Sequence, residues 1–127
     1  MNNRIYFGIA QFEDLVYIIG GSLKDRTLSN VSILKSQHEV ESTSLPLVGG
    51  QRPNCCTFGH RYIYTVGYET RGDRTSIQQL DIERNSWIVL HTIVDRRIWL
   101  VGLHMVDEDT LIMFGGQAIS DNNMKYN

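Results

Sequence analysis

Three short apolar runs, each closed by glycine, recur along this chain at a nearly constant interval. They occupy residues 15–21, 62–68 and 111–116. Their first glycines are 47 and 48 residues apart: Gly20, Gly67 and Gly115. Tyr17 and Tyr64 repeat at the same interval of 47 residues. Runs this short, rich in Ile, Val and Tyr, are typical of β-strands. A period of about 50 residues therefore predicts a repeat protein built from short strands.

Each period divides into four predicted strands, which we call a to d. A polar turn at residues 106–110 separates strand a from the glycine-ended strand b, and a tight turn at residues 83–86 leads into strand d. No segment keeps a helical period of about 3.6 residues for three turns, so almost no helix is expected. The other predicted strands are residues 5–9, 55–58 and 98–105 (strand a), 31–35 and 76–82 (strand c), and 87–90 (strand d).

Glycine, tryptophan and arginine take fixed places in the period. Glycine pairs after strand b permit positive φ and a close approach of neighbouring backbones. Trp87 offers a large ring to fill the gap between adjacent units. Each unit can bury its second face only against the next, so stability is shared between neighbours. Three arginines precede the glycines by 16, 15 and 18 residues: Arg4, Arg52 and Arg97.

At these positions the chain resembles the kelch-repeat family. Residues 80–87, Leu-Asp-Ile-Glu-Arg-Asn-Ser-Trp, are similar to the end of a kelch repeat. Residues 95–98, Asp-Arg-Arg-Ile, followed by a hairpin and Phe-Gly-Gly, are similar to a blade boundary in BTB-Kelch substrate adaptors. The chain departs from the family pattern at Leu34 and Lys35 (Tyr-Asp in the family), at Val40 or Glu41 (Trp), and at Tyr68 (the second glycine).

The resemblance implies an all-β fold, a kelch β-propeller fragment of about two and a half four-stranded antiparallel blades. The blades would occupy residues 4–51 and 52–96, with an incomplete one at 97–127. Since propellers typically have about 4–8 blades, we expect either a longer protein or blades supplied by other chains. The two end units would expose apolar faces and unpaired edges, so self-association is expected.

Composition and charge indicate which partners and which cellular location are expected. The 127 residues are 42% hydrophobic and 20% charged, with a formal net charge of −2, as in soluble globular proteins. No general attraction to nucleic acid or to an anionic membrane is expected, and the apolar runs are too short to cross a bilayer. The N-terminus has no signal-peptide pattern, so a cytoplasmic location is expected. The adjacent Cys55 and Cys56 are expected to be buried thiols, because a bridge between neighbours closes a small, strained ring.

Candidate chemistry is sparse. The four histidines never take metal-ligand spacing, so neither a metal nor a cofactor is expected. Glu108 and Asp109 fall in a predicted hairpin turn, where solvated acids are common. The glycine pairs are not followed by the Lys-Ser/Thr and helix of a phosphate loop. Residues 71–73, Arg-Gly-Asp, are interpreted as a glycine turn rather than as an integrin-binding tripeptide. The chain is therefore expected not to be an enzyme.

Exposed arginines are the candidate binding residues. Guanidinium groups donate in a fixed fork that suits carboxylates, so an acidic peptide segment of a protein partner is the expected ligand. The alternative is that these arginines hold neighbouring loops together by hydrogen bonds. The predicted partner-binding set lies at the junctions between strands d and a and in the loops between strands b and c: Arg4, Arg52, Arg71, Arg74, Arg96 and Arg97.

The predicted function is a non-enzymatic protein-protein interaction module. The kelch resemblance implies substrate recognition for a ubiquitin ligase, or cytoskeletal binding. A structural subunit within a larger assembly is the alternative hypothesis. A propeller enzyme is a third, since some kelch relatives are oxidases or sugar isomerases, but it would need a metal cluster or converging titratable groups.

Overall fold

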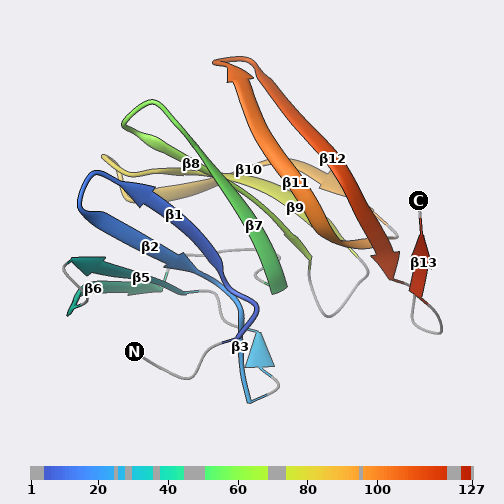
Figure 1. Ribbon diagram of the computed structural model, residues 1–127, viewed down its shortest axis with the longest axis horizontal. Coiled ribbons are helices and arrows are strands. Elements are labelled where there is room, and N and C mark those ends of the chain that lie inside the picture. The colour runs from blue at the N-terminus through green and yellow to red at the C-terminus, as the bar shows by residue number, and fades with distance from the viewer. Residues whose placement is uncertain are drawn as a thin grey trace.

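The chain folds into antiparallel β-sheets. A computed structural model describes residues 5–24, 26–27, 30–35, 38–44, 51–68, 74–94, 96–119 and 124–126. These residues form strands and turns, with no helix among them. The strands make up three larger sheets and one small hairpin (Figure 1). The expectation of an all-β, antiparallel fold is confirmed.

The first sheet is a four-stranded meander. Its strands are β1 (Gly8–Phe12), β2 (Leu15–Ile19), β5 (Asn30–Lys35) and β6 (His38–Ser44). They pair in the order β1-β2-β5-β6, every pair antiparallel. The connection from β2 to β5, predicted as a polar loop, carries a hairpin of its own, made of β3 (Ser22–Leu23) and β4 (Arg26–Thr27).

The second and third sheets repeat this topology. The strands of the second sheet are β7 (Gln51–Phe58), β8 (Tyr62–Tyr68), β9 (Thr75–Asp81) and β10 (Ser86–Ile93). Those of the third are β11 (Arg97–Asp107), β12 (Thr110–Ile119) and β13 (Met124–Tyr126). Both sheets pair their strands in chain order, β7 to β10 and β11 to β13. Each sheet therefore begins with the hairpin predicted for strands a and b.

The three sheets also share a register. In each, the residue just before the first repeat glycine pairs with an equivalent residue of strand a: Ile19 with Gly8, Val66 with Asn54, and Phe114 with Gly102. The intervals of 47 and 48 residues in the sequence thus separate equivalent positions of successive sheets.

Strand a of the first repeat begins later than the sequence predicts. Residues 5–9 are expected as the strand, whereas β1 starts at Gly8. Tyr6 has a φ of 56°, in the left-handed region, which interrupts the extended backbone after Ile5. Ile5 forms an isolated antiparallel bridge with Ser22 instead, its N–H donating to the Ser22 carbonyl at 2.9 Å. The predicted start is wrong because of this local turn.

The glycine pairs serve a backbone purpose in the first and third repeats. Gly20 and Gly21 have φ of 63° and 94°, and the corresponding pair in β12, Gly115 and Gly116, has 73° and 99°. Residues with side chains rarely adopt these angles. In the second repeat neither Gly67 nor Tyr68 has a positive φ. Positive φ is not needed there, which explains why a tyrosine replaces the second glycine.

One apolar cluster joins the first sheet to the second. The first sheet buries the side chains of alternate residues of β1, β2 and β5 against Ile63 and Leu80 of the second sheet. Trp87 of β10 packs against the same cluster, as expected for a ring that fills the gap between units. The buried members are Ala10, Tyr17, Ile19, Val31, Ile33, Ile63 and Leu80.

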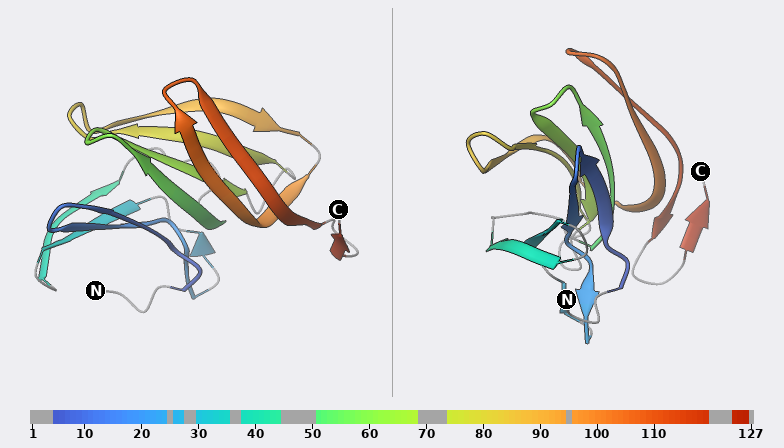
Figure 2. Two further views of the ribbon diagram at one scale, coloured as in Figure 1. Left: turned by 45° about the horizontal axis from the view of Figure 1, so that its top comes forward. Right: turned by 60° about the vertical axis from the view of Figure 1, so that its left-hand side comes forward.

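A second apolar cluster joins the second sheet to the third. Val66 and Ile77, on the opposite face of the second sheet from Ile63 and Leu80, pack with Val101 of β11. Partly buried side chains complete the cluster: Ile98, Leu103, Leu111 and Met113. The second sheet therefore buries both faces, and Figure 2 shows the three sheets stacked with β7 between β1 and β11. Each sheet depends on its neighbour for burial.

Candidate partner-binding surface

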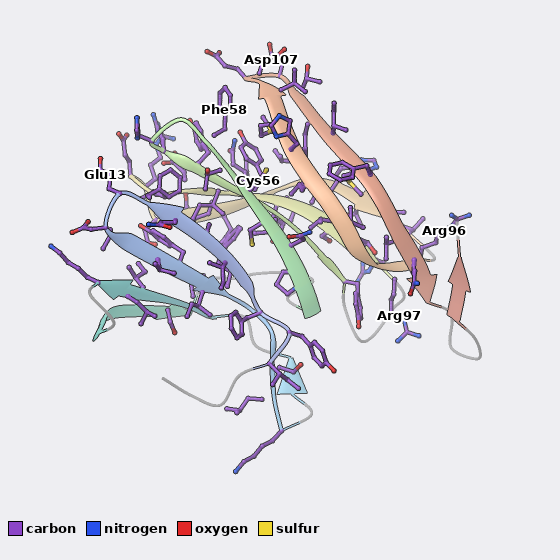
Figure 3. The ribbon with its side chains drawn as sticks, viewed as in Figure 1. Glu13, Cys56, Phe58, Arg96, Arg97 and Asp107 are labelled. Carbon is purple, nitrogen blue, oxygen red and sulfur yellow. The ribbon has the colours of Figure 1, made fainter. Side chains whose placement is uncertain are left out.

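The backbone gathers four of the predicted arginines at one end of the second and third sheets. We call this the junction end, where β7, β9 and β11 begin and β10 finishes. Arg52 is the second residue of β7, Arg74 directly precedes β9, Arg96 directly precedes β11, and Arg97 is its first residue. Figure 3 shows Arg96 and Arg97 near the start of β11, with Asp107 at its far end.

A buried threonine fixes the backbone at the junction end. Thr75, the first residue of β9, has no exposed surface. Its hydroxyl donates to the carbonyl of Arg96 at 2.8 Å and accepts the N–H of Ile98, also at 2.8 Å. One side chain thus holds the backbone on both sides of Arg97, and ties the entry of the third sheet to the second.

The arginines at this end differ in exposure. The side chains of Arg74 and Arg96 are exposed, whereas Arg97 is half-buried. Arg96 therefore presents its guanidinium to solvent from a backbone position held by Thr75. Two predicted residues, Arg4 and Arg71, lie outside the described residues, and for Arg52 only the backbone is described. Arg74 and Arg96 are the described members of the predicted set that suit a solvent-side contact.

The opposite end of the sheets is acidic. We call it the turn end, because it carries the β1–β2 and β11–β12 turns. Glu13 and Asp14 lie in the first of these turns, and Glu108 and Asp109 in the second, all four exposed. Figure 3 shows Glu13, Phe58 and Asp107 spread along this end, away from Arg96 and Arg97. Glu108 and Asp109 are thus the solvated turn acids that the sequence predicts.

The turn end also holds a cleft that sequence reasoning missed. Its volume is about 380 Å³, and it lies between the second sheet and the tip of the β11–β12 hairpin. A neighbouring cleft of about 360 Å³ shares Arg61, Tyr62 and Gln79 with it. The lining of the larger cleft is aromatic and polar: Phe58, Gly59, His60, Arg61, Tyr62, Tyr64, Gln79, Glu108 and Asp109.

Hydrogen bonds order the wall of this cleft. Arg61 donates to both carboxylate oxygens of Asp81, at 3.1 and 2.9 Å, and its guanidinium lies 5.3 Å from the centre of the Tyr62 ring. The amide of Gln79 donates to the Tyr64 hydroxyl at 2.9 Å. The Arg61 hydrogen bonds are the main reason why the pKa of Asp81 lies below its usual value. The wall is therefore held in place before any ligand arrives.

A signal for this wall exists in the sequence. Tyr62 and Tyr64 alternate on strand b, and Gln79 and Asp81 alternate on strand c. In the sheet Tyr64 lies opposite Gln79, and Tyr62 opposite Asp81. An alternating pair on each of two neighbouring strands predicts one shared face. The position of Glu108 against that face depends on how the third sheet packs, which the alternation does not reveal.

The described residues contain little that suits catalysis. The Cys55 thiol packs against the cluster between the first and second sheets, and burial raises its pKa far above the usual value. A buried, protonated thiol is a poor nucleophile. No group of three or more His, Cys, Asp or Glu side chains able to hold a metal ion occurs within the described part of the chain. Nor do the described residues include a helix long and apolar enough to span a membrane.

Comparison with known proteins identifies no matching family model and no similar curated protein. Function is therefore inferred from the residues and geometry of this chain alone.

Proposed function

We propose that this chain is a protein-interaction module of the kelch β-propeller type, and that its junction end binds an acidic segment of a partner protein. The kelch assignment is supported by the equal topology and register of the first two sheets and by the stacking of all three. Stacked four-stranded meanders are the units of a propeller. The motif at residues 80–87, which resembles the end of a kelch repeat, covers the paired ends of β9 and β10.

The observation that carries the binding role is the exposed Arg96 on a backbone held by Thr75. A binding residue is most effective where its backbone is already ordered, because less conformational entropy is lost when the partner binds. Thr75 supplies that order through hydrogen bonds to Arg96 and Ile98. Arg74 is exposed at the same end, and a planar guanidinium suits carboxylates better than other side chains do.

Charge asymmetry supports the choice of an acidic ligand. Arg74 and Arg96 are exposed at the junction end, while at the turn end the exposed acids of the β1–β2, β9–β10 and β11–β12 turns outnumber the exposed Lys35 and Arg84. An acidic segment is attracted to the first and repelled by the second. The asymmetry favours one docking orientation on a protein whose net charge is only −2.

Binding of synthetic peptides tests this function. An array of Asp- and Glu-rich peptides, with the same peptides carrying Asn and Gln as controls, should show binding to the wild-type chain only for the acidic members. Arg96→Ala should lower the affinity for the tightest-binding acidic peptide about ten- to a hundredfold, because one charge-assisted contact contributes about 1.5–3 kcal/mol. The affinity of Arg96→Lys should lie between those of wild type and Arg96→Ala, since lysine keeps the positive charge but cannot donate two parallel hydrogen bonds to a carboxylate.

Arg84→Ala is the matched control. Arg84 is exposed in the β9–β10 turn, so its loss changes net charge equally and should leave peptide affinity within about twofold. The proposal is overturned if no acidic peptide binds, or if Arg96→Ala binds as tightly as wild type. A lower melting temperature with unchanged binding would assign Arg96 the structural role of holding loops together.

A further inference from the structure

The outer face of the third sheet is apolar and open. Phe114 and Ile112 of β12 are 58% and 45% exposed, and His104 of β11, which pairs with Ile112 on the same face, is also exposed. The ring of Phe114 lies across Gly102 on the neighbouring strand, where a Cβ would collide with it. Large exposed side chains gathered on one sheet face are typical of an interaction surface.

The shared register shows what this face corresponds to in the other sheets. Phe114 occupies the position that Ile19 has in the first sheet and Val66 has in the second. Ile19 has no exposed surface and Val66 only 3%, because each packs against the sheet that follows. This register position is thus buried by the following sheet in the first and second sheets, and it is exposed in the third. By this equivalence, the face around Phe114 is shaped to receive another sheet of the same kind.

The complementary face is also present on this chain. The second sheet meets the first through Cys55, Ile63 and Leu80. The register equivalents of these residues in the first sheet are Ile9, Val16 and Leu34. Ile9 is 56% exposed, and Val16 and Leu34 are half-buried. The outer face of the first sheet therefore has the receiving pattern and is open at Ile9, whereas Ile18, which pairs with Ile9 on the same face, is only 4% exposed.

We propose that the Phe114 face binds the Ile9 face of a second copy of this chain, head to tail. Both faces are extensions of interfaces already formed inside the molecule, where the equivalent residues pack sheet against sheet. Neither face carries Lys, Arg, Asp or Glu at the positions named, so stacking them buries apolar surface without desolvating a charge.

A head-to-tail contact between unlike faces can close a ring. The described residues of one copy form three stacked sheets, so those of two copies form six. That number falls within the roughly 4–8 sheets of closed propellers. Two copies joined by two such contacts would cover the Phe114 face and the Ile9 face of each copy. The association does not depend on what the junction end binds.

Sedimentation equilibrium of charge variants tests this inference. Wild type should be dimeric, and Phe114→Asp and Ile9→Asp should each be monomeric, because in each variant one half of every contact is lost. An equimolar mixture of the two variants should recover a dimer. In that mixture the intact Phe114 face of one variant meets the intact Ile9 face of the other, through a single contact and hence with weaker affinity than wild type.

Val94→Asp is the control, because Val94 is 62% exposed and belongs to neither face. It should remain dimeric, and circular dichroism should show the same strand content in all four proteins. Wild type that remains monomeric at its highest soluble concentration overturns the inference. A dimeric Ile9→Asp also overturns it, since the Phe114 face would then pair with itself. So does a mixture that stays monomeric.

Discussion

The hydroxyl of Thr75 lies 2.8 Å from the carbonyl oxygen of Arg96 and donates a hydrogen bond to it, across 21 residues of sequence. The same hydroxyl accepts the N–H of Ile98. Thr75 belongs to the second sheet, and Ile98 lies at the entry of the third. A buried side chain therefore adds hydrogen bonds to the apolar contacts between these two sheets, as Asn54 of β7 also does by donating to the Val101 carbonyl of β11.

Thr75→Val should destabilise the protein. The substitution keeps the shape of the side chain but leaves a carbonyl and an N–H near the interface without their shared partner. The free energy of unfolding should fall by about 1–3 kcal/mol, measured by urea denaturation. Thr75→Ser keeps the hydroxyl and should recover most of the loss.

Thr65→Val is the matched comparison. Thr65 is 1% exposed in β8, and its hydroxyl oxygen has no hydrogen-bond partner among the described residues. Removing a buried hydroxyl that has no such partner should leave the free energy of unfolding unchanged or raise it. Equal losses in Thr65→Val and Thr75→Val would contradict the role given to the Thr75 hydrogen bonds.

The sequence predicts the strands and turns of this fold best where the hydrophobic pattern and the backbone preferences of the residues indicate the same element. The glycine-ended strands are where they are expected, and the turn predicted at residues 83–86 is found one residue earlier, at 82–85, because alternation and turn residues determine these elements locally. Strand β7 begins at Gln51, four residues before the predicted start at Cys55. Pro53 argues against a strand there, but the register shifts between Gln51 and Asn54, and such irregularities tolerate proline.

The candidate site is only partly readable from sequence. The positions of Arg96 and Arg97 at a strand junction follow from the repeat. Their difference in exposure does not, and the hydrogen bonds that hold this piece of backbone come from Thr75, more than 20 residues away. The cleft beside Tyr64 is a similar case, since one of its walls comes from the neighbouring sheet. Contacts between two sheets can be predicted only when the packing of those sheets on each other is known.

The pair of Arg61 and Asp81 should make stability depend on pH in the acid range. The pKa of Asp81 is lowered in the folded protein, chiefly by the Arg61 hydrogen bonds, so the folded state favours the ionised carboxylate. The contribution is complete above the unfolded pKa of about 3.9 and is lost as the pH falls through the lower folded value. Asp81→Asn should therefore reduce the melting temperature at neutral pH, and the difference from wild type should shrink at acid pH.

Asp14→Asn controls for the general effect of removing an acid. Asp14 pairs with Lys35 at 3.5 Å, but both side chains are more than half exposed, so this pair should contribute little. Its melting temperature should follow that of wild type at every pH. A deficit in Asp81→Asn that is the same at neutral and acid pH would show that the lost interaction is not ionic.

The two cysteines should differ in reactivity although they are adjacent. Both are free thiols, and neighbours on a strand face opposite sides. Burial raises the pKa of both, and the neighbouring Cys56 raises that of Cys55 further, while a hydrogen bond with the Met105 backbone partly offsets the effect at Cys56. Since the thiolate is the reactive form, iodoacetamide should modify Cys56 before Cys55 in the native protein.

Peptide mass spectrometry with fragmentation measures the order of modification. Unfolding in urea should abolish the difference, because both thiols then return to ordinary pKa values. Earlier modification of Cys55 in the native state would contradict the packing of that thiol between the first and second sheets.

Gly8 of β1 lies against Pro53 and Cys55 of β7, so it should not tolerate a side chain. A Cβ at this position would fall on the sulfur of Cys55 and lie 3.2 Å from the Pro53 carbonyl oxygen. Gly8→Ala should therefore lower the free energy of unfolding by about 1–3 kcal/mol, as overpacking of a core does. Cys55→Ala removes the sulfur, so the double variant should recover part of that loss, leaving the cost of the contact with Pro53.

Urea denaturation of both single variants and the double variant gives the coupling energy between the two positions. The coupling should be favourable and about 0.5 kcal/mol or more, as for residues in contact. Gly59→Ala is the comparison: its Cβ would meet nothing within 4 Å, and its cost comes from a φ of 64°. Cys55→Ala should not alter that cost. Additive losses in the double variant Gly8→Ala with Cys55→Ala would show that the first and second sheets are not packed through this contact.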